Sequence, residues 1–199
     1  LLSQIAQGKA DYSEAQNMNQ RYGELLELAQ KLPQTVISIA KGSILGGGLG
    51  LIAISDLVLC HTQTLFALPE AKLGLIPAQV APFVIQRIGL SATRRMALCG
   101  TKLTAEQALN LNLVDQLYVN DHELEDILKQ YKRAIAGLAP QARAQTKALL
   151  MQLDQQTMPS QYQSAMRIDN NESLFTVEQA ALSFVKSLKS DEFQHGSQA

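Results

Sequence analysis

The pattern of hydrophobic and polar positions predicts an α/β first half of the chain. Residues 35–40 (Thr-Val-Ile-Ser-Ile-Ala) form a β-branched apolar run typical of a buried strand, and residues 57–61 predict a second short strand. Three consecutive glycines, Gly46 to Gly48, interrupt the apolar pattern between them, and the small apolar residues 49–54 are compatible with a buried helix. Two strands separated by one helix form the βαβ pattern of a right-handed crossover.

The remaining segments are predicted to be mostly helical. Helices are expected at about residues 12–31, 78–88 and 91–98, and the capping-box spacing of Thr104 and Gln107 predicts the start of another. Gly89 and Gly100 are the expected stops. After a last strand at 114–118, helices are expected at 121–138, 140–153, 160–169 and 173–188. We therefore expect residues 1–120 to form the α/β part and residues 121–199 a helical region with a polar tail, placed for contact with another subunit.

Composition narrows the classes of function. The chain has 199 residues, of which 46% are hydrophobic, enough for a substantial core. Its net charge of −1 and pI near 6.3 give no electrostatic basis for nucleic-acid binding. Cys60 and Cys99 lie in apolar sequence, so we expect two small core residues in a reducing compartment. The histidines are too dispersed for a local ligand motif, and no metal is expected.

The sequence also carries expectations about location. No apolar stretch reaches the length of a membrane span, because Ser55 and Asp56 interrupt residues 49–60. The first residues lack a signal-peptide pattern and an initiator Met. We therefore expect a cytoplasmic protein without a membrane span, and a chain that is a fragment of a longer one.

The glycine run is the strongest candidate for chemistry. At a strand-to-helix junction, bare backbone N–H groups stabilise an oxygen that becomes negative during a reaction. A dinucleotide fingerprint beginning at Gly46 fails because residue 51 is Leu51, and a phosphate loop counted from Gly42 lacks its Lys and Ser/Thr. The competing interpretation, in which the glycines only turn the chain and permit close helix packing, has nearly even odds from these residues alone.

A larger set of fixed offsets over residues 39–117 resembles the crotonase, or enoyl-CoA hydratase/isomerase, superfamily. The matching residues are Gly42, Leu45 to Gly48, Asp56, Phe66, Pro69, Glu70, Leu73, Gly74, Ile76, Pro77, Arg87 to Gly89, Arg95, Gly100, Ala105 to Ala108, Leu113 and Val114. The resemblance implies a crotonase-like spiral of βαβ units with a helical C-terminal trimerisation region. It also implies trimers or hexamers, an acyl-CoA thioester as substrate, no other cofactor, and a lyase or isomerase of fatty acid metabolism.

The resemblance assigns roles to individual residues. The Gly47 N–H, flanked by Gly46 and Gly48, corresponds to one of two oxyanion-hole donors, and the other donor belongs to a loop ahead of the present chain. Glu70 matches one of two hydratase glutamates, although a lone Glu on a turn is often a solvated surface residue. Gly50 stands where the other glutamate would be. Phe184 and Lys189, in a weaker match to the family's last helix, would contact CoA from a neighbouring subunit.

With one glutamate absent, three interpretations stay open: a variant hydratase, a double-bond isomerase, or a weakly active acyl-CoA-binding relative. The variant hydratase is favoured because residues 78–82 (Ala-Gln-Val-Ala-Pro) replace the usual glycine-rich run and resemble the isohexenylglutaconyl-CoA or 3-methylglutaconyl-CoA hydratases. Leu73, Ala78, Gln79 and Phe83 are the expected substrate pocket. Gln79 would orient water or a distal carboxylate, or else simply face solvent. The cation that would meet a distal carboxylate is left open among Lys72, Arg87, Arg94 and Arg95.

Overall fold

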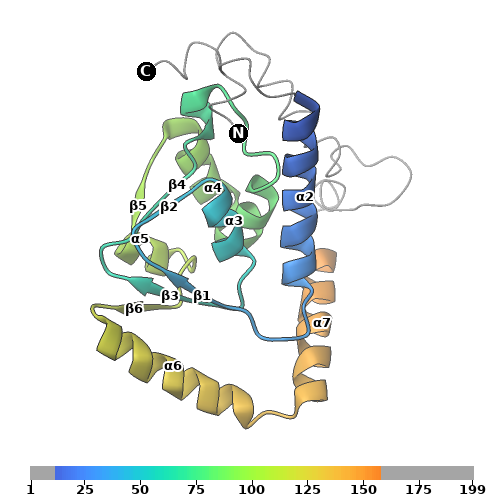
Figure 1. Ribbon diagram of the computed structural model, residues 1–199, viewed down its shortest axis with the longest axis vertical. Coiled ribbons are helices and arrows are strands. Elements are labelled where there is room, and N and C mark those ends of the chain that lie inside the picture. Colours follow the sequence, from blue (N-terminus) through green and yellow to red (C-terminus); the bar gives the residue numbers. More distant parts are fainter. Residues whose placement is uncertain (1–11, 158–199) are drawn as a thin grey trace.

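The computed structural model describes residues 12–157 (Figure 1). The two helices expected at 160–169 and 173–188, and with them Phe184 and Lys189, lie outside the described residues. Within the described part, both halves of the chain contain the predicted classes of structure, with strands up to residue 118 and helices after it.

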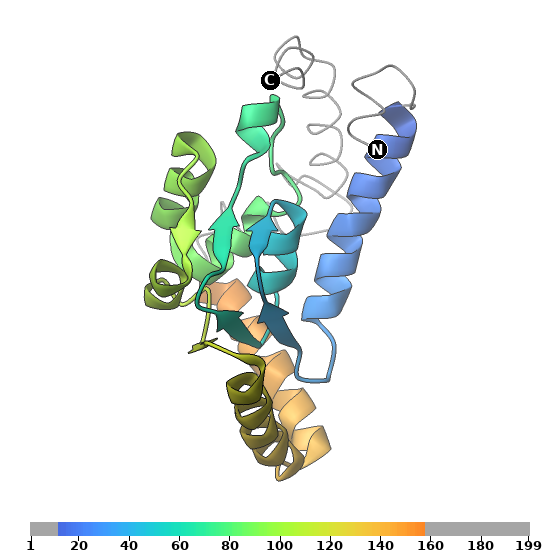
Figure 2. The same cartoon turned by 60° about the vertical axis from the view of Figure 1, so that its left-hand side comes forward.

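Six short strands form two small sheets. Their bounds are β1 Ile37–Ala40, β2 Ser43–Leu45, β3 Leu57–His61, β4 Leu65–Ala67, β5 Leu103–Thr104 and β6 Gln116–Tyr118. The first sheet has the order β1-β3-β6 and is parallel throughout. The second has the order β2-β4-β5, in which β2 and β4 are parallel and β5 is antiparallel (Figure 2). The chain crosses from the first sheet to the second twice, after β1 and after β3.

In the described part of the chain, six α-helices and one 3₁₀ turn connect and cover the strands. Their bounds are α2 Tyr12–Gln30, α3 Gly47–Ala53, η1 Glu70–Leu73, α4 Ala81–Cys99, α5 Ala105–Asn110, α6 Asp121–Ala136 and α7 Pro140–Thr157. The predicted capping box of Thr104 and Gln107 is present at α5. Gly100, with φ of 63°, ends α4, and Gly89, with φ of 78°, kinks it. Both glycines were predicted as stops, and both occupy backbone conformations that disfavour residues with a Cβ.

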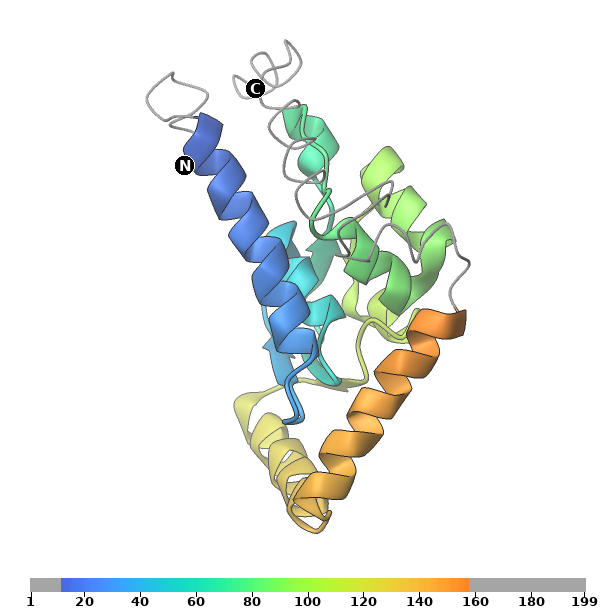
Figure 3. The same cartoon turned by 90° about the vertical axis from the view of Figure 1, so that its right-hand side faces the viewer.

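One apolar core lies between these layers. Ala40, Leu49, Val58, Phe66 and Met96 are fully buried in it, and they come from both sheets and the helices α3 and α4. The helix α2 contributes Leu26, which is also fully buried. In two views α2 lies alongside α3 (Figures 1 and 3). The first turn of α3 is therefore fixed between a sheet on one side and a long helix on the other.

Four expectations about the elements need correction. Cys99 is exposed at the end of α4, so only Cys60 is a core residue. The fourth helix begins at Ala81 rather than residue 78, because residues 74–80 form turns before Pro82 can start it. The predicted strand over 114–118 is shorter, starting at Gln116. The strands of the second sheet were not predicted, because two or three residues are too few to show a periodicity of two.

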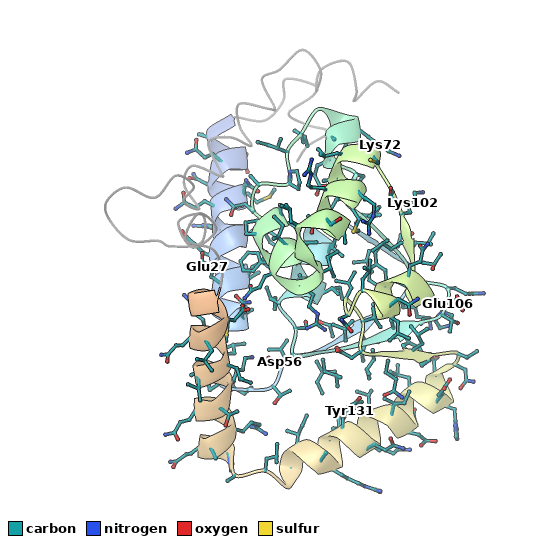
Figure 4. The ribbon with its side chains drawn as sticks, turned by 180° about the vertical axis from the view of Figure 1, so that it is seen from behind. Glu27, Asp56, Lys72, Lys102, Glu106 and Tyr131 are labelled. Carbon is teal, nitrogen blue, oxygen red and sulfur yellow. The ribbon has the colours of Figure 1, made fainter. Side chains whose placement is uncertain are left out.

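The last two described helices extend away from the core and form a V (Figure 3). The helix α6 contacts the first sheet through Ile127, which packs with Leu59 and Tyr118. Tyr131 on α6 donates a hydrogen bond to Gln116 of β6 (3.3 Å; Figure 4). Over residues 12–157, none of the helices combines the length and apolar character that a bilayer crossing requires.

Candidate functional site

The parallel pairing of β2 with β4 brings the glycine run next to Glu70. Ser43 pairs with Leu65 and Leu45 with Ala67, and the Gly46 N–H continues the ladder by donating to the Ala67 carbonyl (3.1 Å). Because both strands end at the same edge, the segments that follow them emerge side by side. This edge, at the carboxyl ends of parallel strands, is where α/β folds commonly place their ligands.

The Glu70 carboxylate lies directly against Gly46. A Cβ placed on Gly46 would be 2.6 Å from Glu70 Oε1, closer than real Cβ contacts allow, and Gly46 has φ of +48°. Position 46 therefore requires glycine for two reasons, the space taken by the carboxylate and the left-handed backbone. The predicted meeting of Glu70 with the glycine turn is present in the structure.

Glu70 is a desolvated carboxylate rather than a surface one. Its Oε2 atom is buried and has no hydrogen-bond partner among the described residues. Burial raises the pKa of Glu70 above its ordinary value of 4.5, and a hydrogen bond from its own backbone N–H opposes this with a smaller effect. A half-buried carboxyl with an unpartnered oxygen and a raised pKa is suited to taking up and returning a proton.

The N–H groups at the start of α3 complete this edge. Gly47 is the first residue of the helix, and within residues 12–157 its N–H has no hydrogen-bond partner, as expected for a first turn. Such a donor can stabilise a developing negative charge on oxygen. The oxyanion role of Gly47, like the catalytic role of Glu70, stays a prediction that this geometry permits.

A tyrosine that sequence analysis did not select also reaches this turn. The Tyr22 hydroxyl of α2 donates a short hydrogen bond to the Gly47 carbonyl. Burial raises the pKa of Tyr22 to about 12, so the phenol is neutral at physiological pH. Nothing near Tyr22 in the sequence indicates this contact, because the two residues lie on separate helices 25 positions apart.

Gly50 is packed against the same helix. A Cβ on Gly50 would lie 2.9 Å from Leu26 Cδ1 and 3.2 Å from the Tyr22 hydroxyl. The space that a side chain at position 50 would need is therefore occupied by α2. The absence of a glutamate here is part of the packing between two helices.

The four predicted pocket residues differ in their surroundings. Gln79 is only 5% exposed, which contradicts the alternative that it faces solvent. Phe83 is also buried and packs in the apolar core, whereas Leu73 is exposed and Ala78 half-buried. Their role as a substrate pocket stays a prediction.

Of the four candidate cations, Arg87 is already engaged within the fold. It forms an ion pair with Asp115 (2.9 Å) and donates to the carbonyls of Ser55 and Asn112. Asp115 also accepts from the Val58 N–H (2.7 Å). This network joins α4 to the first sheet, so Arg87 is assigned a structural role.

A cavity of about 680 Å³ lies away from the glycine turn. It is bounded by the C-terminal end of α3, by α4 and by α7, and of the predicted site residues only the candidate cation Arg87 lines it. Asp56, on this side of the core, is visible between the sheet and α7 (Figure 4). The Glu70 carboxylate and the N–H donors lie at the opposite end of α3, so this cavity is separate from the glycine turn. Across residues 12–157, no cluster of side chains could hold a metal ion.

Comparisons with known proteins give matches in sequence and in fold. A family model described as enoyl-CoA hydratase/isomerase matches residues 2–194. Among curated proteins, the chain is 27% identical over 180 residues to the enoyl-CoA hydratase ACTT6 of Alternaria alternata. The matched region covers 88% of this chain and 60% of that protein. It spans about half to two thirds of the first curated relatives that it matches.

Two solved structures are informative in different ways. The chain is 34% identical to AtuE of Pseudomonas aeruginosa, with a TM-score of 0.69 and coverage of 98% of this chain and 69% of that one. The enoyl-CoA hydratase of Bacillus halodurans superposes with a TM-score of 0.79 over 99% of this chain and 72% of that one. At 23% identity, the second match shows the fold alone. Together these matches confirm the predicted crotonase-like α/β fold with its helical C-terminal region.

Proposed function

The chain belongs to the enoyl-CoA hydratase/isomerase family, and on this premise we propose that the full-length protein hydrates a 2-enoyl-CoA thioester with Glu70 as its single proton carrier. The observation that carries the proposal is the Glu70 carboxylate, which is desolvated and lies against the glycine turn, with one oxygen that has no partner within residues 12–157. A structural role would have left this carboxyl paired or solvated.

The proposed mechanism moves one proton through Glu70. The carboxylate accepts a proton from water while the water oxygen bonds to the β-carbon, and the electron pair of the double bond moves onto the thioester oxygen. The Gly47 N–H stabilises that oxygen, together with a second donor from a loop that precedes this chain. Protonated Glu70 then donates to the α-carbon, which restores the carboxylate and adds one water overall.

We further propose a branched acyl group with a distal carboxylate as the substrate. The support is the resemblance of residues 78–82 to the branched glutaconyl-CoA hydratases, together with the burial of Gln79. A buried amide beside an acyl chain has donors and an acceptor for such a carboxylate or for water.

For the assembly, we propose trimers or hexamers. Apolar residues exposed on α7 support this, among them Leu149, Leu150 and Leu153.

A double-bond isomerase is the second candidate, and Gly50 is the observation that favours it. Isomerisation requires one base to move a proton from the α- to the γ-carbon, and the missing second carboxylate is then of no consequence. The two reactions differ in water uptake. Incorporation of oxygen-18 from solvent into the product is expected for hydration and absent for isomerisation.

The test is an assay of the full-length protein against a panel of straight and branched 2-enoyl- and 3-enoyl-CoA thioesters. We expect hydration of a branched 2-enoyl-CoA, and a loss of about 10²-fold or more in kcat for Glu70→Gln if proton transfer is its role. Glu106→Gln, at an exposed glutamate on α5, is the matched control and should retain full activity. Normal hydration by Glu70→Gln would reject the proposal. Acyl-CoA binding in calorimetry without any turnover would instead show that the protein is an acyl-CoA-binding member of the family.

A further inference from the structure

We propose that Tyr22 is a positioning residue that orients the attacking water, in the place left by the glutamate absent at position 50. This inference rests on the proposed hydration. It concerns a residue on a different element, α2, that no motif of the glycine run includes. The argument has three steps: where the hydroxyl lies, which hydrogen bonds it can make, and what Glu70 needs from a partner.

The hydroxyl lies where a side chain at position 50 would begin. It is 3.2 Å from a Cβ placed on Gly50 and 3.6 Å from one placed on Gly47. Glu70 Oε1 is 2.6 Å from a Cβ placed on Gly46, the preceding residue. Phenol and carboxylate therefore flank the same short stretch at the start of α3, and they reach it from different elements, α2 and η1.

The hydrogen-bonding capacity of this hydroxyl is restricted. Its proton is donated to the Gly47 carbonyl, which leaves the oxygen lone pairs as acceptors. Burial keeps the phenol neutral, because the pKa of Tyr22 is about 12. Tyr22 therefore cannot act as the base, but it can accept a hydrogen bond from a water molecule.

These properties complement Glu70. A nucleophilic water has two O–H groups, and when Tyr22 accepts one of them the other is directed to the carboxylate that removes its proton. The oxygen lone pair is then left facing the β-carbon. A hydratase with one glutamate benefits from such a neutral acceptor, because a water held only by Glu70 is free to rotate and a second contact fixes its orientation.

Tyr22→Phe in the full-length protein tests this role, because it removes only the hydroxyl. Two rates are measured: hydration of the 2-enoyl-CoA substrate, and exchange of the α-protons of the saturated acyl-CoA with deuterium oxide. Exchange needs Glu70 and the Gly47 N–H but no attacking water. We expect hydration kcat to fall about tenfold, the rate equivalent of one lost neutral hydrogen bond, with KM within about twofold and exchange unchanged.

Ser55→Ala is the matched control. The Ser55 hydroxyl also donates to a backbone carbonyl of α3, that of Leu51 (2.7 Å), but at the end of the helix remote from the glycine turn. It should leave both rates unchanged. If Tyr22→Phe lowers hydration and exchange together, Tyr22 only holds the glycine turn in place and the inference is wrong; unchanged hydration also overturns it. Wild-type protein that exchanges α-protons but hydrates no substrate rejects the proposed function itself, and this inference with it.

Discussion

At the scale of single residues, Glu70 combines two opposed requirements. Its position against Gly46 places the carboxylate at the site, and the same position removes it from water, so the charged form is disfavoured. The buried charge of Glu70 therefore lowers the stability of the fold, while the same burial makes the carboxylate more reactive toward a proton. Glu70 therefore has separate, measurable effects on activity and on stability.

The effect of Glu70 on activity should appear as a pH–rate profile whose acid limb is shifted to higher pH. Since Glu70 must be ionised to accept a proton and its pKa is raised above 4.5, hydration should decline with falling pH at a higher pH than an ordinary glutamate would give. A pH profile of kcat/KM for the full-length protein measures this limb. An acid limb at or below 4.5 would contradict the raised pKa.

The effect of Glu70 on stability is unfavourable at neutral pH. A group whose pKa is raised in the folded state favours folding below its unfolded pKa, and that contribution is lost as the pH rises through the folded pKa. At neutral pH the buried charge of Glu70 therefore disfavours the fold, so Glu70→Gln should have a higher Tm than wild type at pH 7. The difference should shrink as the pH is lowered toward 4. Thermal unfolding of both proteins at several pH values checks the sign, and Glu106→Gln should show no such trend.

Gly47 could be selected from sequence because a glycine run between a strand and a helix is a local pattern, and Glu70 because its offset from that run matches the family resemblance. Tyr22 could not, because its contact depends on how α2 crosses α3, and no local periodicity encodes that crossing. Gln79 was selected from the sequence, but its environment was left open between the substrate pocket and solvent. Gln79 lies in a turn over residues 78–80 just before α4 begins, and the sequence did not specify the geometry that buries it there.

At the scale of elements, α3 is a short helix whose faces differ in their tolerance of a side chain. Gly50 faces α2, where Leu26 fills the available space. A Cβ on Gly48 would instead meet Ile44 Cγ2 at 3.5 Å, an ordinary van der Waals distance. Packing therefore favours glycine at position 50 but leaves room for a Cβ at position 48.

Substitution by alanine is expected to have opposite effects on stability at Gly48 and at Gly50. Gly48→Ala should raise the free energy of unfolding by up to ~1 kcal/mol, the gain in helix propensity. Gly50→Ala has the same gain but overpacks a buried contact at ~1–3 kcal/mol, so the protein should be destabilised. Urea unfolding of the two variants decides between them. A stabilised Gly50→Ala would mean that Leu26 moves aside freely and that α2 does not fix position 50.

The helices were the elements best predicted from sequence, because their patterns extend over several turns. The capping residues Thr104 and Gly100 were also predicted, since caps are local chemistry. The second sheet was missed, and with it the reason that Glu70 reaches Gly46. Its strands of two or three residues are defined by their partners and not by their own composition.

At the scale of the whole molecule, a polar bridge joins the outer helix α7 to the core. Lys147 of α7 donates to Asp56 (2.6 Å) and to the Gln34 carbonyl, and Asp56 also accepts from the Val36 N–H (2.7 Å). The Lys147 side chain is only 14% exposed. This bridge lies beside the 680 Å³ cavity and fixes α7 across it.

Lys147→Met should therefore cost ~1.5–3 kcal/mol of stability, the range for a hydrogen bond to a charged group. Lys129→Met is the matched control, because Lys129 pairs with Glu125 and Asp126 on the exposed surface of α6. Its expected cost is within ~0.5 kcal/mol. Hydrogen exchange should show faster exchange in α7 for the first variant alone. Equal, small effects of the two variants would show that apolar contacts suffice to hold α7.

The packing of Leu26 on Gly50 also limits how this chain can change over evolutionary time. A glutamate at position 50 would begin 2.9 Å from Cδ1 of the fully buried Leu26, so it needs space that this leucine occupies. Reducing Leu26 first would open a core cavity, at ~2–5 kcal/mol for Leu→Ala. Either order passes through a less stable intermediate. The contact therefore disfavours a second carboxylate at position 50, and a second polar group beside Glu70 has to come from another element of the fold.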